Sequence, residues 1–147
     1  GCGQAERPKL VIPESATILY DTTLPDVEYK YRSVAFSLAP IYEMNKKAYK
    51  QCMYDSLRTD LCLTFVYTGT EEDKQELMRR MAKDKKMFNT LVYWDGKKEF
   101  YTANDIDREM HFIAYLVNGL NQIVKAANPT VYNFDSDSLK ELYKSME

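Results

Sequence analysis

The sequence predicts an α/β domain in which helices flank both faces of a mixed β-sheet. Three observations support this prediction. Residues 61–67 (Leu-Cys-Leu-Thr-Phe-Val-Tyr) form a nearly continuous apolar run, typical of a strand covered on both faces in a parallel sheet. Amphipathic helical patterns precede and follow this run, as they do in β-α-β units. Further along, Asn118-Gly119 separates two apolar runs and predicts an antiparallel hairpin.

The first half of the chain predicts a peripheral strand over 17–20, a strand over 29–38 and a helix over 40–58. Pro40 suits the first turn of that helix, where a missing N–H costs little. We expect the strands that contain Val34 and Leu63 to pair in parallel. A second helix begins after Gly69, with Thr70 and Asp73 as its capping pair. Its predicted buried stripe consists of Leu77, Met78, Met81 and Ala82.

The second half predicts a short strand over 90–94 that ends at Asp95-Gly96. Residues 100–106 form a short helix or turn, and 111–117 and 122–126 form the hairpin. A last helix begins near Ser138, which stands at capping-box spacing from Glu141. This order places a β-α-β unit before a hairpin and a terminal helix.

Length and charge exclude several classes of protein. A chain of 147 residues has room for one ordinary domain. It carries 20 Lys and Arg against 22 Asp and Glu, so it lacks the basic excess of a nucleic-acid-binding protein. Its apolar runs are all too short to cross a bilayer. Its glycines are scattered, so no phosphate-binding loop is predicted, and we expect no cofactor.

The cysteines point to location rather than to metal binding. Cys2, Cys52 and Cys62 are widely spaced and His111 is the only histidine, so no zinc site is predicted. Two oxygen-rich segments, 105–109 and 133–137, do not continue as calcium loops. Gly1-Cys2-Gly3-Gln4 is typical of a mature bacterial lipoprotein, whose cysteine carries the lipid. We therefore expect a tether with a peripheral strand over 1–27, a folded domain over 28–147, and a lipid-anchored protein of the bacterial cell envelope.

Five segments of the second half match, in order, the elements of one known family. Residues 88–95 (Phe-Asn-Thr-Leu-Val-Tyr-Trp-Asp) are similar to its strand after the second helix. Its following short helix, its hairpin, the end of the hairpin and its closing helix are matched by 99–104, 112–124, 127–129 and 139–144. On these segments the chain resembles, from Tyr29 to the C-terminus, the thioredoxin-like superfamily, in its peroxiredoxin-like and thiol–disulfide branch of envelope lipoproteins. The resemblance implies a thioredoxin-like fold.

The chain departs from this branch where the branch does its chemistry. Active relatives carry C-x-x-C where the first strand enters the first helix, since the helix terminus lowers the pKa of the attacking thiol. This chain has Ala39-Pro40-Ile41-Tyr42-Glu43-Met44 there, and Glu43 would oppose a thiolate. The cis-proline ahead of the hairpin is replaced by Glu109-Met110-His111-Phe112. Ordinary dithiol exchange is not expected.

Three functions remain open. The first is a redox-inactive module that binds an envelope protein or peptide in a groove lined by Pro40, Ile41, Tyr42, Met44, His111 and Phe112. The second is a thiol-dependent oxidoreductase or peroxidase that uses Cys52 or Cys62, although both positions suit core packing. The third is a carbohydrate- or small-ligand-binding protein that uses its tyrosines. Those tyrosines are Tyr29, Tyr31, Tyr42, Tyr49, Tyr54, Tyr93 and Tyr101.

Overall fold

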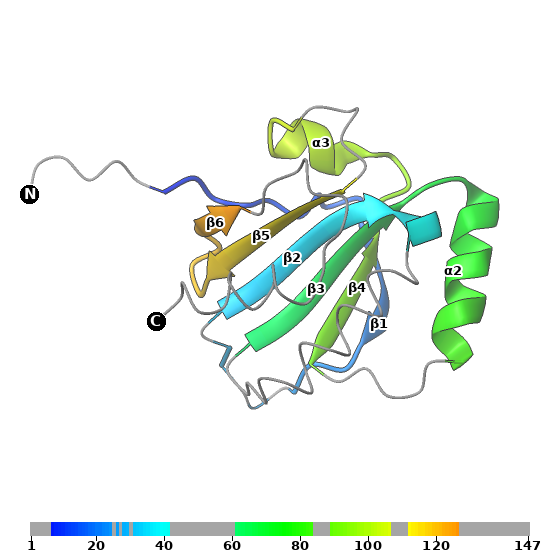
Figure 1. Ribbon diagram of the computed structural model, residues 1–147, viewed down its shortest axis with the longest axis horizontal. Coiled ribbons are helices and arrows are strands. Elements are labelled where there is room, and N and C mark those ends of the chain that lie inside the picture. Colours follow the sequence, from blue (N-terminus) through cyan, green and yellow to red (C-terminus); the bar gives the residue numbers. More distant parts are fainter. Residues whose placement is uncertain are drawn as a thin grey trace, which may run out of the picture.

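In the part of the chain that the computed structural model describes, six strands form one mixed sheet in the order β1-β4-β3-β2-β5-β6 (Figure 1). The structure describes residues 7–24, 26, 28–29, 31–41, 61–83, 89–106 and 112–126. The predicted helix over 40–58 lies outside these residues except for its start, where Ala39–Ile41 form a 3-10 turn, η1. The predicted last helix near Ser138 lies wholly outside them.

The centre of the sheet is parallel. β2 (Tyr31–Leu38), β3 (Leu61–Thr68) and β4 (Thr90–Trp94) run in one direction. β2 and β3 pair along their whole length with Val34 opposite Thr64, which confirms the predicted parallel pairing. Both faces of β3 are covered, since Leu63, Val66 and Tyr67 are all buried. The continuous apolar run in the sequence reflects this central position.

The two outer parts of the sheet are antiparallel. β5 (Phe112–Asn118) pairs with β2 and forms the predicted hairpin with β6 (Ile123–Ala126). Asn118 organises the hairpin turn, because its Oδ1 accepts the backbone N–H groups of Leu120 and Gln122 at 2.9 and 3.1 Å. At the opposite edge, β1 (Thr17–Asp21) pairs with β4, so the predicted peripheral strand is confirmed.

The main apolar core lies under α3 (Glu99–Ala103). Side chains alternate between the two faces of a strand, so Phe36 of β2 and Val66 of β3 point to the same face as this helix. Phe100 stacks on Phe36, with ring centroids 4.6 Å apart, and Tyr101 meets Phe36 edge-on at the same distance. The short helix therefore contributes two aromatic rings to the core.

The helix α2 (Glu71–Lys83) follows β3 and is set apart from α3 in Figure 1. Leu77 and Met81 are its buried residues. The prediction that Met78 and Ala82 share this stripe is wrong, because Met78 is 43% exposed and Ala82 is exposed too. Successive residues of a helix lie 100° apart, so only the pair spaced by four residues faces inward here.

Residues Pro8–Ile12, which we call the strap, are packed against the domain. They belong to the predicted tether, of which residues 1–6 lie outside the described part of the chain. The backbone of Lys9 pairs with that of Gln122 in an isolated antiparallel β-bridge, and the backbone N–H of Ile123 donates to the Pro8 carbonyl at 2.8 Å. Leu10 is buried in the core beneath α3. The folded unit therefore begins well before residue 28.

Candidate functional site

The candidate site lies where β2 ends and η1 begins, at the carboxyl ends of the parallel strands. Ligands of open α/β sheets are commonly bound at this end. Leu38 is the last residue of β2, Ala39 is buried, and Pro40 is exposed. The helix α2 contacts η1, so the turn is held between β2 and α2. The chain thus presents an exposed proline, and no thiol, at the tip of the central strand.

Two buried polar residues, Thr68 and Asp95, lie next to this turn at the ends of the neighbouring strands. Leu38 pairs with Thr68 of β3, and Asp95 follows β4 at the same level, because its backbone N–H donates to the Tyr67 carbonyl at 2.8 Å. Thr68 and Asp95 are both fully buried. In the described part of the chain, the hydroxyl of Thr68 has no hydrogen-bond partner.

Asp95 acts as a helix cap. Its two carboxylate oxygens accept the backbone N–H groups of Glu99 and Phe100 at 3.1 and 2.9 Å. These are amides of the first turn of α3, which otherwise lack partners, and the carboxylate also complements the positive end of the helix. Burial, together with the charge of Asp95, raises the pKa of the Tyr101 hydroxyl. Asp95 is thus bound to backbone and positions α3 under the sheet.

The start of α2 is capped in the predicted way. The Thr70 N–H donates to Asp73 Oδ2 at 2.8 Å, and the Asp73 N–H donates to Thr70 Oγ1 at 3.1 Å. Gly69 makes room for this arrangement, because a Cβ there would lie 2.6 Å from the Asp73 carboxylate. The first turns of α2 and α3 are therefore both capped by side chains of the chain itself, Thr70 with Asp73 at α2 and Asp95 at α3.

The structure brings together the predicted groove residues that it describes. Ser37 pairs with Phe112, so the backbone at the start of β5 lies at the same end of the sheet as Pro40 and Ile41. The other three predicted groove residues, Tyr42, Met44 and His111, lie outside the described residues, as does the predicted lipidation site Cys2. The groove itself stays a prediction.

Cys62 lies at the opposite end of the sheet from the candidate site. Its register partner is Arg32, six positions before Leu38 on β2, which corresponds to about 20 Å at ~3.3 Å per residue. The thiol is fully buried and forms no disulfide. Burial raises the pKa of the thiol, and the nearby Arg32 guanidinium only partly opposes this effect. A reactive cysteine needs exposure and a lowered pKa, and Cys62 has neither; Cys52 lies outside the described residues.

The candidate tyrosines do not form an exposed set where the structure describes them. Tyr101 is buried against Phe36, and Tyr93 is half-buried beside the same core. The Tyr29 hydroxyl donates to Asn89 Oδ1 at 2.8 Å and accepts the Leu24 N–H at 3.0 Å. These three rings therefore serve the fold. The side chain of Tyr31 lies outside the described part of the structure, as do the whole residues Tyr42, Tyr49 and Tyr54.

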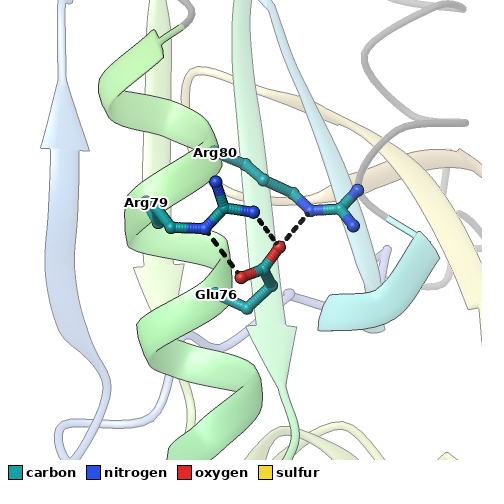
Figure 2. Close-up of polar contacts among 3 residues, drawn as sticks. All are labelled: Glu76, Arg79 and Arg80. Atoms are coloured by element: carbon teal, nitrogen blue, oxygen red, sulfur yellow. Dashed lines mark hydrogen bonds and ion pairs between the residues drawn. The ribbon is translucent and has the colours of Figure 1, made fainter.

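Charge is concentrated on the solvent side of α2. Figure 2 shows Glu76 held between Arg79 and Arg80, one helical turn further on. Hydrogen bonds from the two guanidinium groups lower the pKa of Glu76 from 4.5 to about 2. Glu76 is three and four residues from its partners, the spacings at which ion pairs support a helix. Because the three side chains are exposed, these ion pairs add little stability. It is a surface feature of the helix, separate from the turn.

No helix within the described residues is long and apolar enough to cross a membrane. No protein-family model matches the sequence, and no curated protein matches it either.

Solved structures do match. The thioredoxin domain of a thiol-disulfide oxidoreductase from Bacteroides vulgatus superposes with a TM-score of 0.59 at 16% identity, covering 98% of this chain and 99% of that one. A domain of a possible thiol-disulfide isomerase from Cytophaga hutchinsonii gives 0.58 at 14% identity, covering 99% and 95%. StoA from Bacillus subtilis gives 0.58 at 17% identity, covering 88% and 96%.

The protein therefore has the thioredoxin-like fold, a mixed sheet with helices on both faces. Its neighbours in structure are thioredoxin-like proteins of the thiol–disulfide oxidoreductase type. At these identities the likeness concerns the fold alone, and function depends on the site residues of this chain.

Proposed function

We propose that the protein is a redox-inactive thioredoxin-like module of the bacterial cell envelope that binds a protein or peptide and is anchored by a lipid on Cys2. The observation that carries the proposal is the sequence Ala39-Pro40-Ile41 at the end of β2. The resemblance places the active thiols of related proteins in this segment, and this chain offers an exposed proline there. An apolar turn beside the start of β5 is suited to contact an extended peptide.

The main alternative is a thiol-dependent oxidoreductase or peroxidase, which the likeness to thiol–disulfide oxidoreductases and isomerases favours. It requires Cys52 or Cys62 to act as the nucleophile, and the burial of Cys62 opposes its use. A carbohydrate-binding function requires exposed tyrosines, and Tyr101 is buried.

Turnover assays separate binding from catalysis. We expect no reduction of insulin and no consumption of peroxide above the rate of a Cys52→Ala/Cys62→Ala double variant. Turnover that is lost in that double variant would contradict the proposal.

Crosslinking tests the binding site. A photo-crosslinking amino acid in place of Tyr42 should give one discrete adduct in cells, and the same residue in place of Ile18 should give none. Ile18 is a suitable control because it is 56% exposed on the far edge strand. Phe112→Asp should abolish the adduct. Equal capture from both positions, or no adduct from Tyr42, would contradict the proposed groove.

A further inference from the structure

The strap is joined to the domain by hydrogen bonds at Pro8, Leu10 and Val11. Besides the Pro8 bond to Ile123, the Leu10 N–H donates to the Asn121 carbonyl at 2.8 Å. The Asn104 side chain accepts the Val11 N–H at 2.7 Å and donates to the Val11 carbonyl at 2.8 Å. The strap therefore has a fixed position beside the β5–β6 hairpin turn, residues 118–122, and beside the end of α3.

This fixed position limits how far the domain can move from a lipid on Cys2. Six Cα–Cα steps separate Cys2 from Pro8. At no more than ~3.6 Å each, they span at most about 22 Å. Because Pro8 is hydrogen-bonded to β6, an acylated Cys2 would keep this edge of the sheet close to the bilayer. A longer free tether would leave the orientation open.

The surface at this edge suits an anionic bilayer. Residues 7–12 and 118–122 together contain two basic residues, Arg7 and Lys9, and no acidic one. Both basic residues are exposed. Leu120 projects from the hairpin turn and is 69% exposed. A cation beside an apolar side chain is the combination that binds the interface of a membrane with anionic lipids.

The opposite edge of the sheet is acidic at the end of β1. β1 is the other edge strand of the sheet, and it ends at the exposed Asp21. The exposed residues Asp26 and Glu28 follow, whereas the acidic and basic residues of α2 are equal in number. Figure 1 shows α2 on the side of the molecule away from β6 and the start of the strap. Anionic lipids would repel the exposed carboxylates at and after the end of β1, so charge and tether length favour the same edge of the sheet.

We propose that the edge formed by the strap and the hairpin turn lies against an anionic membrane surface, with Arg7 and Lys9 at the lipid headgroups and Leu120 at the interface. The proposal rests on the proposed acylation of Cys2. The hairpin turn follows the last residue of β5, whereas the candidate groove lies at the first, six residues or about 20 Å away. The groove is thereby directed away from the bilayer, toward partners in the aqueous space.

The test uses the full acylated chain in vesicles of phosphatidylethanolamine and phosphatidylglycerol. A fluorescent amino acid replaces either Leu120 or, as a matched exposed control, Ile18. Lipids with a nitroxide on the headgroup should quench the fluorophore at position 120 at least threefold more than that at position 18. Equal quenching, or stronger quenching at position 18, would overturn the proposal.

Charge reversal provides a second measurement. Arg7→Glu with Lys9→Glu should remove most of the difference between the two positions in these vesicles, since each basic residue near an anionic surface strengthens binding about fivefold. In phosphatidylcholine vesicles the double variant should behave like the parent. An unchanged difference in anionic vesicles would count against the proposed contact.

The proposed lipid anchor and the proposed orientation can be refuted independently of each other. An intact mass without acyl chains on Cys2 would refute the proposed anchor alone. The quenching comparison would then use a Cys52→Ser variant coupled through Cys2 to a maleimide lipid. Stronger quenching at position 120 would still support the proposed membrane-facing edge, and its loss would refute that edge.

Discussion

Phe36 and Phe100 stack nearly parallel, with their planes 2° apart. Phe36 is the buried centre of β2, and Phe100 lies in the first turn of α3 behind the Asp95 cap. Stacking at short centroid distance adds to the burial of the two rings. This contact connects the central strand, which leads to the candidate site, with the helix that closes the core.

Removal of one ring should be costly. We expect Phe100→Ala to lower the free energy of unfolding by about 3–5 kcal/mol, because both apolar contact and a cavity are involved. Denaturant unfolding followed by circular dichroism measures the change. Leu24→Ala, at a residue 54% exposed, should stay within about 0.5 kcal/mol of the parent. A loss below 1 kcal/mol for Phe100→Ala would contradict the stacked core.

The two methionines of α2 form a matched pair. Met81 is 5% exposed and Met78 is 43% exposed. We expect Met81→Ala to cost about 2–5 kcal/mol and Met78→Ala less than about 1 kcal/mol. Thermal and denaturant unfolding would show the difference. Similar losses for the two variants would mean that the helix buries the broader stripe that its sequence suggests.

Asn104 holds the strap through its side-chain amide, whose Nδ2 also donates to the Phe100 carbonyl at 3.0 Å. Asn104→Asp keeps an acceptor for the Val11 N–H but loses both donated bonds. We expect a loss of about 1–3 kcal/mol at neutral pH. A protonated carboxyl can donate again, so part of the loss should be recovered in acid relative to the parent. A variant as stable as the parent at neutral pH would contradict this role.

Stability should fall in alkali. Burial raises the pKa of Cys62 above its ordinary 9.0, and of Tyr101 and Tyr115 above their ordinary 10.0. As pH rises through these ordinary values, the unfolded chain loses protons that the folded protein retains, so unfolding becomes more favourable. Unfolding curves from pH 8 to pH 11 test this. Cys62→Ala should flatten the lower part of the decline, and no decline would contradict the buried placement.

Glu76 should titrate far below a free carboxyl. The guanidinium groups favour its charged form in the folded protein, so its stabilising effect is present above pH 4.5 and is lost as pH falls toward about 2. NMR titration of the side-chain carboxyl carbon measures the midpoint. Arg79→Gln with Arg80→Gln should return the midpoint toward 4.5. An unshifted midpoint in the parent would refute the paired geometry.

The strands β2, β3 and β5 could be predicted from the sequence because burial on both faces requires continuous apolar runs. The hairpin turn could be predicted from Asn118-Gly119. The capping role of Asp95 could not be predicted from the sequence, because the folded structure is needed to place the Glu99 and Phe100 amides beside its carboxylate. Leu10 is buried and Ile12 half-buried in a segment whose other residues are exposed, and only the short apolar run Leu10-Val11-Ile12 in the sequence indicated this. At the candidate site, sequence located the turn after β2, but pairing across the sheet was needed to place Phe112 beside it.

The strap has a consequence for the behaviour of the protein at high local concentration. An open strand edge is a template on which other chains can add strands and aggregate. At one edge, the strap occupies part of the outward-facing hydrogen-bonding groups around β6. At the other, the register of β1 shifts between Ile18 and Tyr20, an irregularity that disfavours regular addition. Molecules crowded in two dimensions on a surface would therefore be protected from sheet-to-sheet polymerisation, and loss of the strap would remove that protection at one edge.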